Sequence, residues 1–384
     1  MSFALVRARL LPLAAEFCGA SSLVLSGIYI PLKYMIVFYT IMYYFSFTMT
    51  HWQWTLSLAA LCILFLLAIG FAYESIGERM DVRRHPAPGR LILAGDHELH
   101  LLCKGSAAPT VVIEQGAGEP SRFWWPVQNR IAEFARVCTY DRAGFAWSEP
   151  TRQGRTIEDR ADELHTLLFN AGEPGPYILV AHSYGGLIVR GFTRKYPDKV
   201  AALVLVDTPE EASIFHPDVL DFYSKARLLN GAVGFAARFG ALRLLKHWIP
   251  LDRMGFWLER PAEYAALCDD LASLERVPVY RRSSEEAGSL GELPVAVITH
   301  GRPFPGPFAI LEKNWSEGQT RLAALSTNSL LIVARNSNHM IEIDEPHVVV
   351  DLIRRVHIAV CSHTALSQNG AMSVASQEIP AHEA

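Results

Sequence analysis

The ten residues Tyr177-Ile-Leu-Val-Ala-His-Ser-Tyr-Gly-Gly186 decide the fold of this chain. The apolar run Tyr177–His182 predicts a strand buried on both faces, as in a parallel sheet covered by helices. Ser183 follows this strand directly, and the small residues at positions 181, 185 and 186 leave room for a sharp turn into a helix. This is the Gly-x-Ser-x-Gly pattern with Ala181 in the first position. We expect Ser183 to project from the turn as a nucleophile, the alternative being an inert turn serine.

Other apolar runs of strand length lie on both sides of this motif and alternate with stretches of helical spacing, such as residues 156–171. This alternation predicts an α/β fold with a mostly parallel eight-stranded sheet and helices on both faces. Leu91–Gly95 and Glu98–Cys103 enclose a Gly-Asp turn and are expected to pair as a hairpin. The other predicted strands are Thr110–Gln115, Arg136–Asp141, Val200–Val206, Pro294–Thr299 and Ser329–Ala334.

The strand pattern stops between residues 208 and 293. This stretch is rich in Leu, Ala and Arg and is expected to be a helical insertion, with helices over Val233–His247 and Ala262–Leu274. Residues 88–207 and 294–360 then form the core, which a helix over residues 346–359 closes. Residues 362–384 are small and polar, and such a composition predicts a disordered tail.

Composition excludes several classes of protein. Of the 384 residues, 50% are hydrophobic and only 19% are charged, unlike a disordered or nucleic-acid-binding tail. The 35 basic and 39 acidic residues give a net charge of −4, so no overall field attracts DNA or RNA. We therefore expect no nucleic-acid partner.

The N-terminal region has the composition of a membrane anchor. No Asp, Glu, Lys or Arg occurs from Tyr34 to Tyr73, and a run of this length has room for two crossings of about 20 residues each. Trp54–Tyr73 is the cleaner span, Tyr34–Phe47 is shorter, and Thr48–Trp54 is expected at a hairpin tip. A third crossing within residues 10–31 is weaker. We expect residues 1–80 to be a lipid-embedded anchor with two helices, followed by a charged linker at residues 79–89.

The cysteines show no motif. They stand at positions 18, 62, 103, 138, 268 and 361 without any Cys-x-x-Cys pair. This spacing excludes a zinc ribbon, a thioredoxin motif and a compact disulfide scaffold. We expect buried free thiols, because free cysteine behaves as a small hydrophobic residue.

A nucleophilic serine needs a base, and the position of the motif predicts where the base lies. Serine hydroxyls are activated by a histidine that an acid orients. With the nucleophile on a central strand, the histidine is expected after the last strand. His339 stands there, in the polar loop at residues 336–340, whereas His347 and His357 belong to the closing helix. We expect His339 to be the base, the alternative being a surface histidine.

From about residue 88 to residue 360 the chain resembles the α/β-hydrolase fold family, in its membrane-anchored bacterial branch. The matching pieces, besides the serine turn, are Gln115–Gly118, Tyr140–Ser148, Val206–Asp207 and Asn338–His339. The family typically has His-Gly at positions 115–116 and Gly at position 181. Neither departure touches a group that must ionise.

The resemblance implies an oxyanion hole made by the backbone N–H groups of Ala117 and Tyr184. The Gly-rich loop at residues 116–118 agrees, because backbone approaches a ligand closely at the carboxyl edge of a sheet. A plain tight turn is the alternative. Asp141 and Arg142 are expected to form an ion pair that braces a neighbouring turn. Trp124 and Trp125 are expected either to line the pocket or to pack in the core.

The acid has two candidate positions. Many relatives carry it after the strand that here is residues 294–299, but the following segment, His300–Gly306, contains no carboxylate. Glu312, the next acidic residue, falls in an expected helix. Asp207 directly follows the neighbouring strand, and we expect it to orient His339. The alternative is that Asp207 caps the next helix.

These residues predict a membrane-anchored serine hydrolase that cleaves a small-molecule carboxylic ester, or less favourably an amide, through an acyl-enzyme. The insertion at residues 208–293 would cover the serine as a cap. A serine at this turn argues against the haloalkane dehalogenase and epoxide hydrolase branches, which use Asp. No metal or organic cofactor is implied. The alternatives are an acyltransferase or carbon–carbon bond hydrolase on the same triad, or a non-catalytic membrane binding protein.

The charged residues around the apolar run predict on which side of the membrane the hydrolase domain lies. Arg79, Arg83, Arg84 and Arg90 follow the run, and Arg7, Arg9 and Lys33 precede it. Positive flanks stay on the cytoplasmic side, so two crossings place the hydrolase domain in the cytoplasm. The resemblance favours the opposite, because relatives with a single anchor and a short basic N-terminus would export the domain. We expect the cytoplasmic face.

Overall fold

The computed structural model describes residues 22–25, 28–31, 36–40, 51–151, 154–246, 260–276 and 290–366. The chain divides into two compact units, residues 1–69 and residues 70–384. In the first unit, β1 (Ser22–Leu25) and β2 (Ile28–Pro31) pair in antiparallel orientation, in part of the segment considered for a third crossing. Helix α3 runs from His51 to Arg84 and so belongs to both units.

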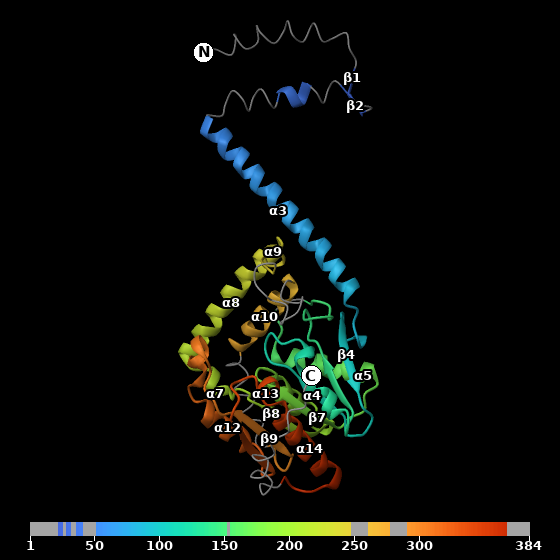
Figure 1. Ribbon diagram of the computed structural model, residues 1–384, viewed down its shortest axis with the longest axis vertical. Helices are drawn as coiled ribbons and strands as arrows, with labels where there is room; N and C mark the ends of the chain where they lie inside the picture. The colour runs from blue at the N-terminus through green and yellow to red at the C-terminus, as the bar shows by residue number, and fades with distance from the viewer. Residues whose placement is uncertain are drawn as a thin grey trace, which may run out of the picture. The chain divides into compact units, whose positions relative to one another are not determined.

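The second unit contains an eight-stranded sheet among its described residues, in the order β10-β9-β8-β7-β5-β6-β4-β3. Figure 1 labels β4, β7, β8 and β9 of this sheet. The pairs from β10 to β6 are parallel, and β4 pairs antiparallel with both β6 and β3. The strands are β3 (Arg90–Leu93), β4 (Glu98–Lys104), β5 (Val111–Glu114), β6 (Val137–Tyr140), β7 (Tyr177–His182), β8 (Val200–Val206), β9 (Val295–His300) and β10 (Ser329–Ala334). The predicted α/β-hydrolase architecture, with a mostly parallel sheet, is confirmed.

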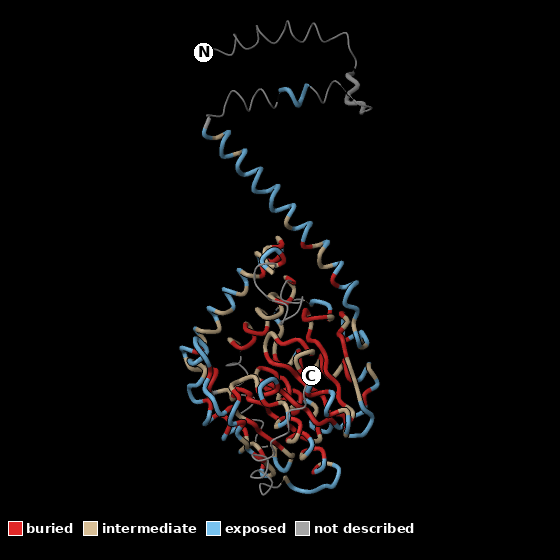
Figure 2. Tube along the Cα trace, viewed as in Figure 1, coloured by how far each residue is buried: buried red, intermediate tan, exposed pale blue. Residues whose placement is uncertain are grey.

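Helices cover both faces of the sheet. They are α4 (Trp125–Ile131), α5 (Ile157–Ala171), α6 (Gly185–Lys195), α12 (Trp315–Ala323), α13 (Ile341–Asp344) and α14 (Pro346–Ser362). Alternate residues of each central strand face opposite cores, so Ile178 packs with α4 and α14 whereas Leu179 packs with α5 and α6. Figure 2 shows these strands almost entirely buried. Burial on both faces is why the central strands appear in the sequence as continuous apolar runs.

Helices follow β8 where an insertion was expected. They are α7 (Glu211–Ile214), α8 (Pro217–Ala237), α9 (Ala241–Leu245) and α10 (Pro261–Leu274). The single helix predicted over Val233–His247 is wrong, because Gly240 has a left-handed φ of 74° and separates α8 from α9. A Cβ at Gly240 would lie 2.7 Å from the ring of Tyr73, so the break also permits a close approach. Sequence periodicity does not show such a break, since the apolar spacing continues through it.

Among the described residues, α3 is the one helix long and apolar enough to cross a membrane. Its side chains are almost all exposed up to Tyr73 (Figure 2). The helix already begins at His51, so the residues from Trp52 to Trp54 are helical rather than at a hairpin tip. The other expected crossing, Tyr34–Phe47, lies outside the described residues except for positions 36–40, as do residues 367–384 of the expected tail.

The predicted linker at residues 79–89 starts too early, because α3 continues to Arg84. The reason is an ion-pair cluster in the second unit. Buried Arg243 of α9 donates to Glu74 at 3.0 Å and to Asp81 at 2.6 Å, which lie on the same face of α3 about two turns apart. Gly70 lies against the backbone of Phe239, where a Cβ would come within 2.5 Å of the carbonyl oxygen. These tertiary contacts extend the helix through a segment whose charge suggested a linker.

Two cysteines overturn the expectation that all of them are free thiols. Cys103 of β4 and Cys138 of β6 are register partners on adjacent antiparallel strands and form a disulfide, with a Cα–Cα distance of 4.1 Å. Their sequence separation of 35 does not indicate the pairing, because the two strands become neighbours only in the folded sheet. The described free thiols are Cys62 and Cys361, which are exposed, and Cys268, which is partly buried, so the expected burial is wrong as well. Cys18 lies outside the described residues.

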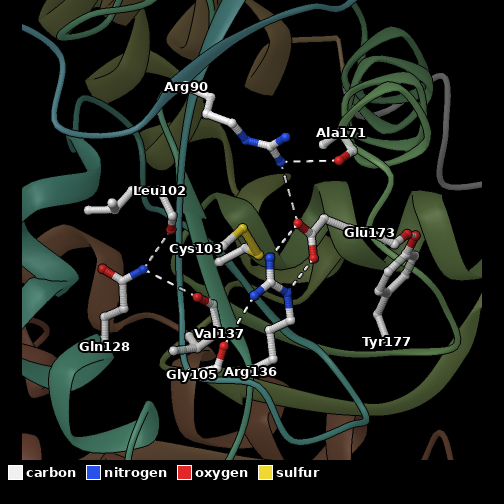
Figure 3. Close-up of a disulfide and its surroundings, with 11 residues drawn as sticks. Arg90, Leu102, Cys103, Gly105, Gln128, Arg136, Val137, Ala171, Glu173 and Tyr177 are labelled. Atoms are coloured by element: carbon white, nitrogen blue, oxygen red, sulfur yellow. Dashed lines mark hydrogen bonds and ion pairs between the residues drawn. A yellow bond between two sulfur atoms is a disulfide. The ribbon is translucent and has the colours of Figure 1, made fainter.

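Figure 3 shows the polar groups around this disulfide. Arg136 donates to both carboxylate oxygens of Glu173 at 2.6 and 2.7 Å. The amide of Gln128 donates to the Leu102 carbonyl oxygen at 2.7 Å and to the Val137 carbonyl oxygen at 3.4 Å. The disulfide and these bonds tie the antiparallel edge of the sheet to its parallel centre.

Candidate functional site

Ser183 lies on a strained turn between β7 and α6. Its φ is 48°, a left-handed conformation that is costly for a residue with a side chain. The glycines that follow allow close packing, since a Cβ at Gly185 would lie 2.7 Å from the carbonyl oxygen of Gln115. A Cβ at Gly186 would overlap the side chain of Thr208. The small residues noted in the sequence are therefore required by the tight packing of this turn.

Ser183, His339 and Asp207, which are far apart in sequence, form one hydrogen-bonded chain. The Nε2 atom of His339 lies 2.8 Å from Oγ of Ser183, and the Nδ1 atom of the same ring lies 2.7 Å from Oδ2 of Asp207. His339 is in the loop between β10 and α13, and Asp207 directly follows β8 with a φ of 47°. Asp207 is fully buried, and Ser183 and His339 are partly buried.

Asp207 has further donors that the sequence did not suggest. The Nδ1 of His300 lies 2.6 Å from Oδ2, and the indole N–H of Trp315 donates to Oδ1 at 2.9 Å. The Thr299 hydroxyl also donates to Oδ1, at 3.1 Å. Burial alone would raise the pKa of Asp207, but the hydrogen bonds from His300 and His339 outweigh it and hold that pKa well below its usual range. The carboxylate is thus ionised and held on both sides.

His300 occupies the position at the end of β9 where a carboxylate was sought. Its ring bonds Asp207 on one side and approaches Glu312 on the other, with Nε2 3.4 Å from Oε1. The other Glu312 oxygen accepts from the backbone N–H of Phe304 at 3.1 Å. The end of β9 therefore does contribute to the site, but with a histidine that is a second partner of Asp207 and not with the acid. Glu312 contacts Asp207 only through this ring.

The loop at residues 116–118 lies beside the serine turn. Its Gly116 N–H donates to Glu119 at 2.8 Å, and Gly118 has a φ of 74°. The backbone N–H groups of Ala117 and Tyr184 have no hydrogen-bond acceptor within the described part of the chain. The side chains of these two residues belong to the same apolar cluster. Both N–H groups are thus free to bind an oxygen atom.

Arg142 holds this loop from behind. Its guanidinium is buried and donates to the carbonyl oxygens of Gln115 at 2.8 Å and Gly116 at 2.6 Å. It also pairs with Glu114 at 2.8 Å and with Asp270 of α10 at 2.9 Å. Arg142 therefore connects the loop, the sheet and α10.

The expected ion pair between Asp141 and Arg142 is wrong. The carboxylate of Asp141 binds the His100 ring and the backbone N–H of Ser121, both at 2.7 Å. Adjacent residues at a strand end point to opposite sides, so their side chains meet different partners.

Apolar side chains from the inserted helices gather over the serine turn. Besides Ala117, Tyr184, Leu187 and Ile188, the cluster contains Phe215, Leu220, Tyr223, Leu267 and Leu271. The hydroxyl of Tyr184 bonds the Ser273 hydroxyl of α10 at 2.6 Å. Trp124 is fully buried, and the ring of Trp125 stacks on that of Trp147 with 5.8 Å between the ring centroids. Both tryptophans are therefore packing residues.

Three groups of side chains have metal-ligand chemistry within the described ranges, and each already has partners. Cys103 and Cys138 near Glu173 are joined as a disulfide, and Asp207, His300 and His339 bond one another. The third group, Glu119, His182 and Glu342, is buried behind the serine turn and was not noticed in the sequence. In this third group Glu119 accepts the N–H of Gly116 and His182 bonds the His339 carbonyl, whereas neither oxygen of Glu342 has a hydrogen bond.

Comparison with known proteins agrees with the fold. A profile of the alpha/beta hydrolase fold matches residues 109–247. The protein YqjL of Bacillus subtilis (strain 168) is 30% identical over 262 residues, which cover 68% of this chain and 88% of YqjL.

Solved structures show the same fold. An esterase from Thermogutta terrifontis has a TM-score of 0.52 at 21% identity, covering 70% of this chain and 98% of the esterase. The enol-lactonase of Burkholderia xenovorans LB400 has a TM-score of 0.53 at 16% identity, and the match covers 70% of this chain and 99% of the lactonase. The chain therefore belongs to the α/β-hydrolase fold family.

Proposed function

We propose that this chain is a serine hydrolase that cleaves a carboxylic ester through an acyl-enzyme, with an amide as the less favoured substrate. The observation that carries the proposal is the hydrogen-bonded chain from Asp207 through His339 to Ser183, at 2.7 and 2.8 Å. A serine hydroxyl near neutral pH needs such a base and acid to become nucleophilic. Ser183 is then the nucleophile, His339 the general base and Asp207 the acid that orients it.

The reaction follows from this order of groups. Ser183 Oγ attacks the carbonyl carbon while its proton passes to Nε2 of His339. The Nδ1–H of His339 stays bonded to Asp207, whose charge stabilises the imidazolium. The imidazolium protonates the leaving alcohol, and the acyl group remains on Ser183. A water molecule then gives its proton to His339 and attacks the acyl carbon. The bond between the acyl carbon and Ser183 Oγ breaks, His339 returns the proton to Oγ, and the acid is released.

The negative charge that develops on the carbonyl oxygen needs donors. The backbone N–H groups of Ala117 and Tyr184 have the required freedom, and Tyr184 is at the N-terminus of α6, whose dipole favours an anion. Loss of one such donor typically lowers the rate by about 10²–10³. Arg142 keeps the Ala117 loop in place through two backbone carbonyls.

The helices between β8 and β9 suit an apolar acyl group. We propose that residues 208–293 are a cap over a core of residues 88–207 and 294–360. Leu267 and Leu271 of α10 lie in the apolar cluster with Ala117 and Tyr184. Pockets of this kind combine apolar walls with a few placed polar groups. Acyl transfer to an alcohol, or carbon–carbon bond hydrolysis, would use the same residues, and the identity of the second substrate would distinguish them.

Labelling with a fluorophosphonate probe tests the proposal without a known substrate. We expect the detergent-solubilised full chain to be labelled and Ser183→Ala not to be. A chain-length series of nitrophenyl esters should show hydrolysis that falls by about 10⁴–10⁶ in the same variant. Unchanged ester hydrolysis by folded Ser183→Ala would refute the serine hydrolase, and unlabelled wild type would favour a non-catalytic binding protein.

We further propose that α3 crosses a membrane and that the hydrolase unit lies outside the cytoplasm. Arg79, Arg83 and Arg84 at the end of the helix favour the cytoplasmic face that the charge rule predicts. The Cys103–Cys138 disulfide favours an oxidising compartment, because disulfides rarely persist in a reducing cytosol. We give the disulfide more weight, since charge bias is a tendency that other features override.

A further inference from the structure

A buried group of three ionisable side chains lies directly behind the serine turn. His182 is the last residue of β7, Glu119 follows the Gly116–Gly118 loop, and Glu342 is in α13. Their exposed fractions are 0%, 7% and 1%. Buried charges are expensive unless they are paired, so a group in this position needs a reason.

The contacts of His182 link two parts of the site. Its Nε2 lies 2.9 Å from the backbone carbonyl oxygen of His339, and its Nδ1 lies 2.7 Å from a carboxylate oxygen of Glu119. The second oxygen of Glu119 accepts the N–H of Gly116 at 2.8 Å. A carbonyl oxygen can only accept, so Nε2 carries a proton, whereas Nδ1 and the Glu119 carboxylate form an ion-pair contact whose geometry is not that of an aligned hydrogen bond. The close contact with the Glu119 carboxylate favours the imidazolium form of His182.

We propose that His182, as an imidazolium held by Glu119, is a positioning residue that ties the Gly116–Gly118 loop to the backbone of His339 and sets the charge around the His339 ring. The inference rests on the proposed role of His339 as general base. The link connects the loop that holds the oxyanion donor to the loop that holds the base, through the residue next to the nucleophile. Any shift of one loop is thus transmitted to the other.

The electrostatics agree with this arrangement. Burial would lower the pKa of His182, but the Glu119 and Glu342 carboxylates outweigh it and raise the pKa to about 10. Burial raises the pKa of Glu342 to about 7 against the opposing effect of His182, so Glu342 supplies only part of the neutralising charge. Both oxygens of Glu342 lack a hydrogen bond, although one lies 3.8 Å from His182. Glu119 is therefore the main partner.

The charge on His182 acts on His339, whose ring centroid is 4.6 Å away. Burial lowers the pKa of His339, and the His182 cation lowers it further. The ionisable groups that face this ring from neighbouring elements are Asp207 after β8, His300 at the end of β9, Glu119, His182 and Glu342. Asp207 and Glu119 raise the pKa of His339. A lower pKa keeps more of the base neutral, and therefore competent, in mildly acidic solution.

Two substitutions separate the hydrogen bond from the charge. His182→Gln places an amide N–H near the Nε2 position and can still donate to the His339 carbonyl, but it is neutral. His182→Asn is neutral and too short for that bond. Glu119→Gln removes the anion and leaves Glu342 as the charge partner of His182. His97→Gln is the matched control, because His97 is a buried histidine that pairs with Glu163 at 2.7 Å outside the site.

The readout is the pH dependence of the second-order rate of fluorophosphonate labelling of the full chain in detergent. Loss of the cation should move the acidic limb up by on the order of one pH unit in both His182 variants. Loss of the anion in Glu119→Gln should move the acidic limb to lower pH, because Glu119 raises the pKa of His339. The plateau rate should fall by about tenfold or more in His182→Asn and by less in His182→Gln, because only Asn loses the bond to the base loop.

The outcomes separate this inference from the proposed function. An acidic limb that stays in place in folded His182→Gln, or that moves equally in His97→Gln, overturns the role of His182 while leaving the serine hydrolase intact. If the His182 variants do not fold, an unmoved or raised limb in Glu119→Gln overturns it instead. A wild-type chain that takes no label at any pH overturns the proposed function itself.

Discussion

At the level of single residues, the carboxylate of Asp207 accepts an unusually large number of hydrogen bonds. It accepts hydrogen bonds from two histidine rings, one indole, one hydroxyl and the backbone N–H of His300. Asp207→Asn would keep the shape but place an amide N–H against one of these donors and favour the wrong tautomer of His339. We expect the rate of ester hydrolysis to fall by up to about 10⁴. Steady-state kinetics on nitrophenyl esters measures this loss.

Glu312→Gln is the matched control for that substitution. It removes a negative charge near the same cluster, 3.4 Å from the far nitrogen of His300, without touching Asp207. We expect a change in rate of less than about threefold. A normal Asp207→Asn enzyme together with an impaired Glu312→Gln enzyme would show that the acid is Glu312.

Sequence reasoning located Ser183, His339 and Asp207 because each stands directly after a strand or in the final loop, and chain order predicts which strand ends meet. It missed Glu119, His182 and His300. His182 bonds His339 across 157 positions, and no spacing rule connects them. His300 was passed over because a carboxylate was sought at that strand end. Residues that support a site are found by their contacts, and these exist only in the fold.

At the level of elements, the disulfide closes the antiparallel edge of the sheet. Cys103 and Cys138 are separated by 35 residues, and closing a loop of that size stabilises a protein by about 3–4 kcal/mol in the chain-entropy view. The paired variant Cys103→Ala with Cys138→Ala should lower the free energy of unfolding by about that amount. Guanidinium unfolding in detergent measures it, with Cys361→Ala as the free-thiol control. Equal stability of the two variants would mean that the bond contributes nothing.

The end of α3 is held by tertiary contacts. Arg243 is buried between Glu74 and Asp81, and its removal would leave two buried carboxylates without a cation. Breaking such a pair typically costs about 3–5 kcal/mol. In Arg243→Met we expect hydrogen exchange of residues 74–84 to increase strongly, as mass spectrometry would show. Arg238→Met, at an exposed position nearby, is the control and should leave this exchange unchanged.

Strand positions were predicted within one or two residues because buried parallel strands are continuous apolar runs. Helix ends were predicted less well. The apolar pattern of α8 and α9 continues through the break at Gly240, and α3 runs on into a charged segment because its acidic residues find Arg243 and Arg260. Local composition predicts where an element can exist, and tertiary partners decide where it ends.

At the level of the whole molecule, two features of the chain disagree on which side of a membrane the hydrolase unit lies. Arg79, Arg83, Arg84 and Arg90 favour the cytoplasm, whereas the Cys103–Cys138 disulfide favours an oxidising compartment. We expect alkaline phosphatase fused after Ala384 to be active, and a fluorescent protein that folds only in the cytoplasm to be dark. Thiol alkylation of intact cells before and after reduction gives an independent measurement, since a disulfide releases two additional reactive thiols only after reduction. An inactive phosphatase fusion, together with Cys103 and Cys138 that are alkylated before reduction, would place the unit in the cytoplasm. The arginines would then have decided the topology.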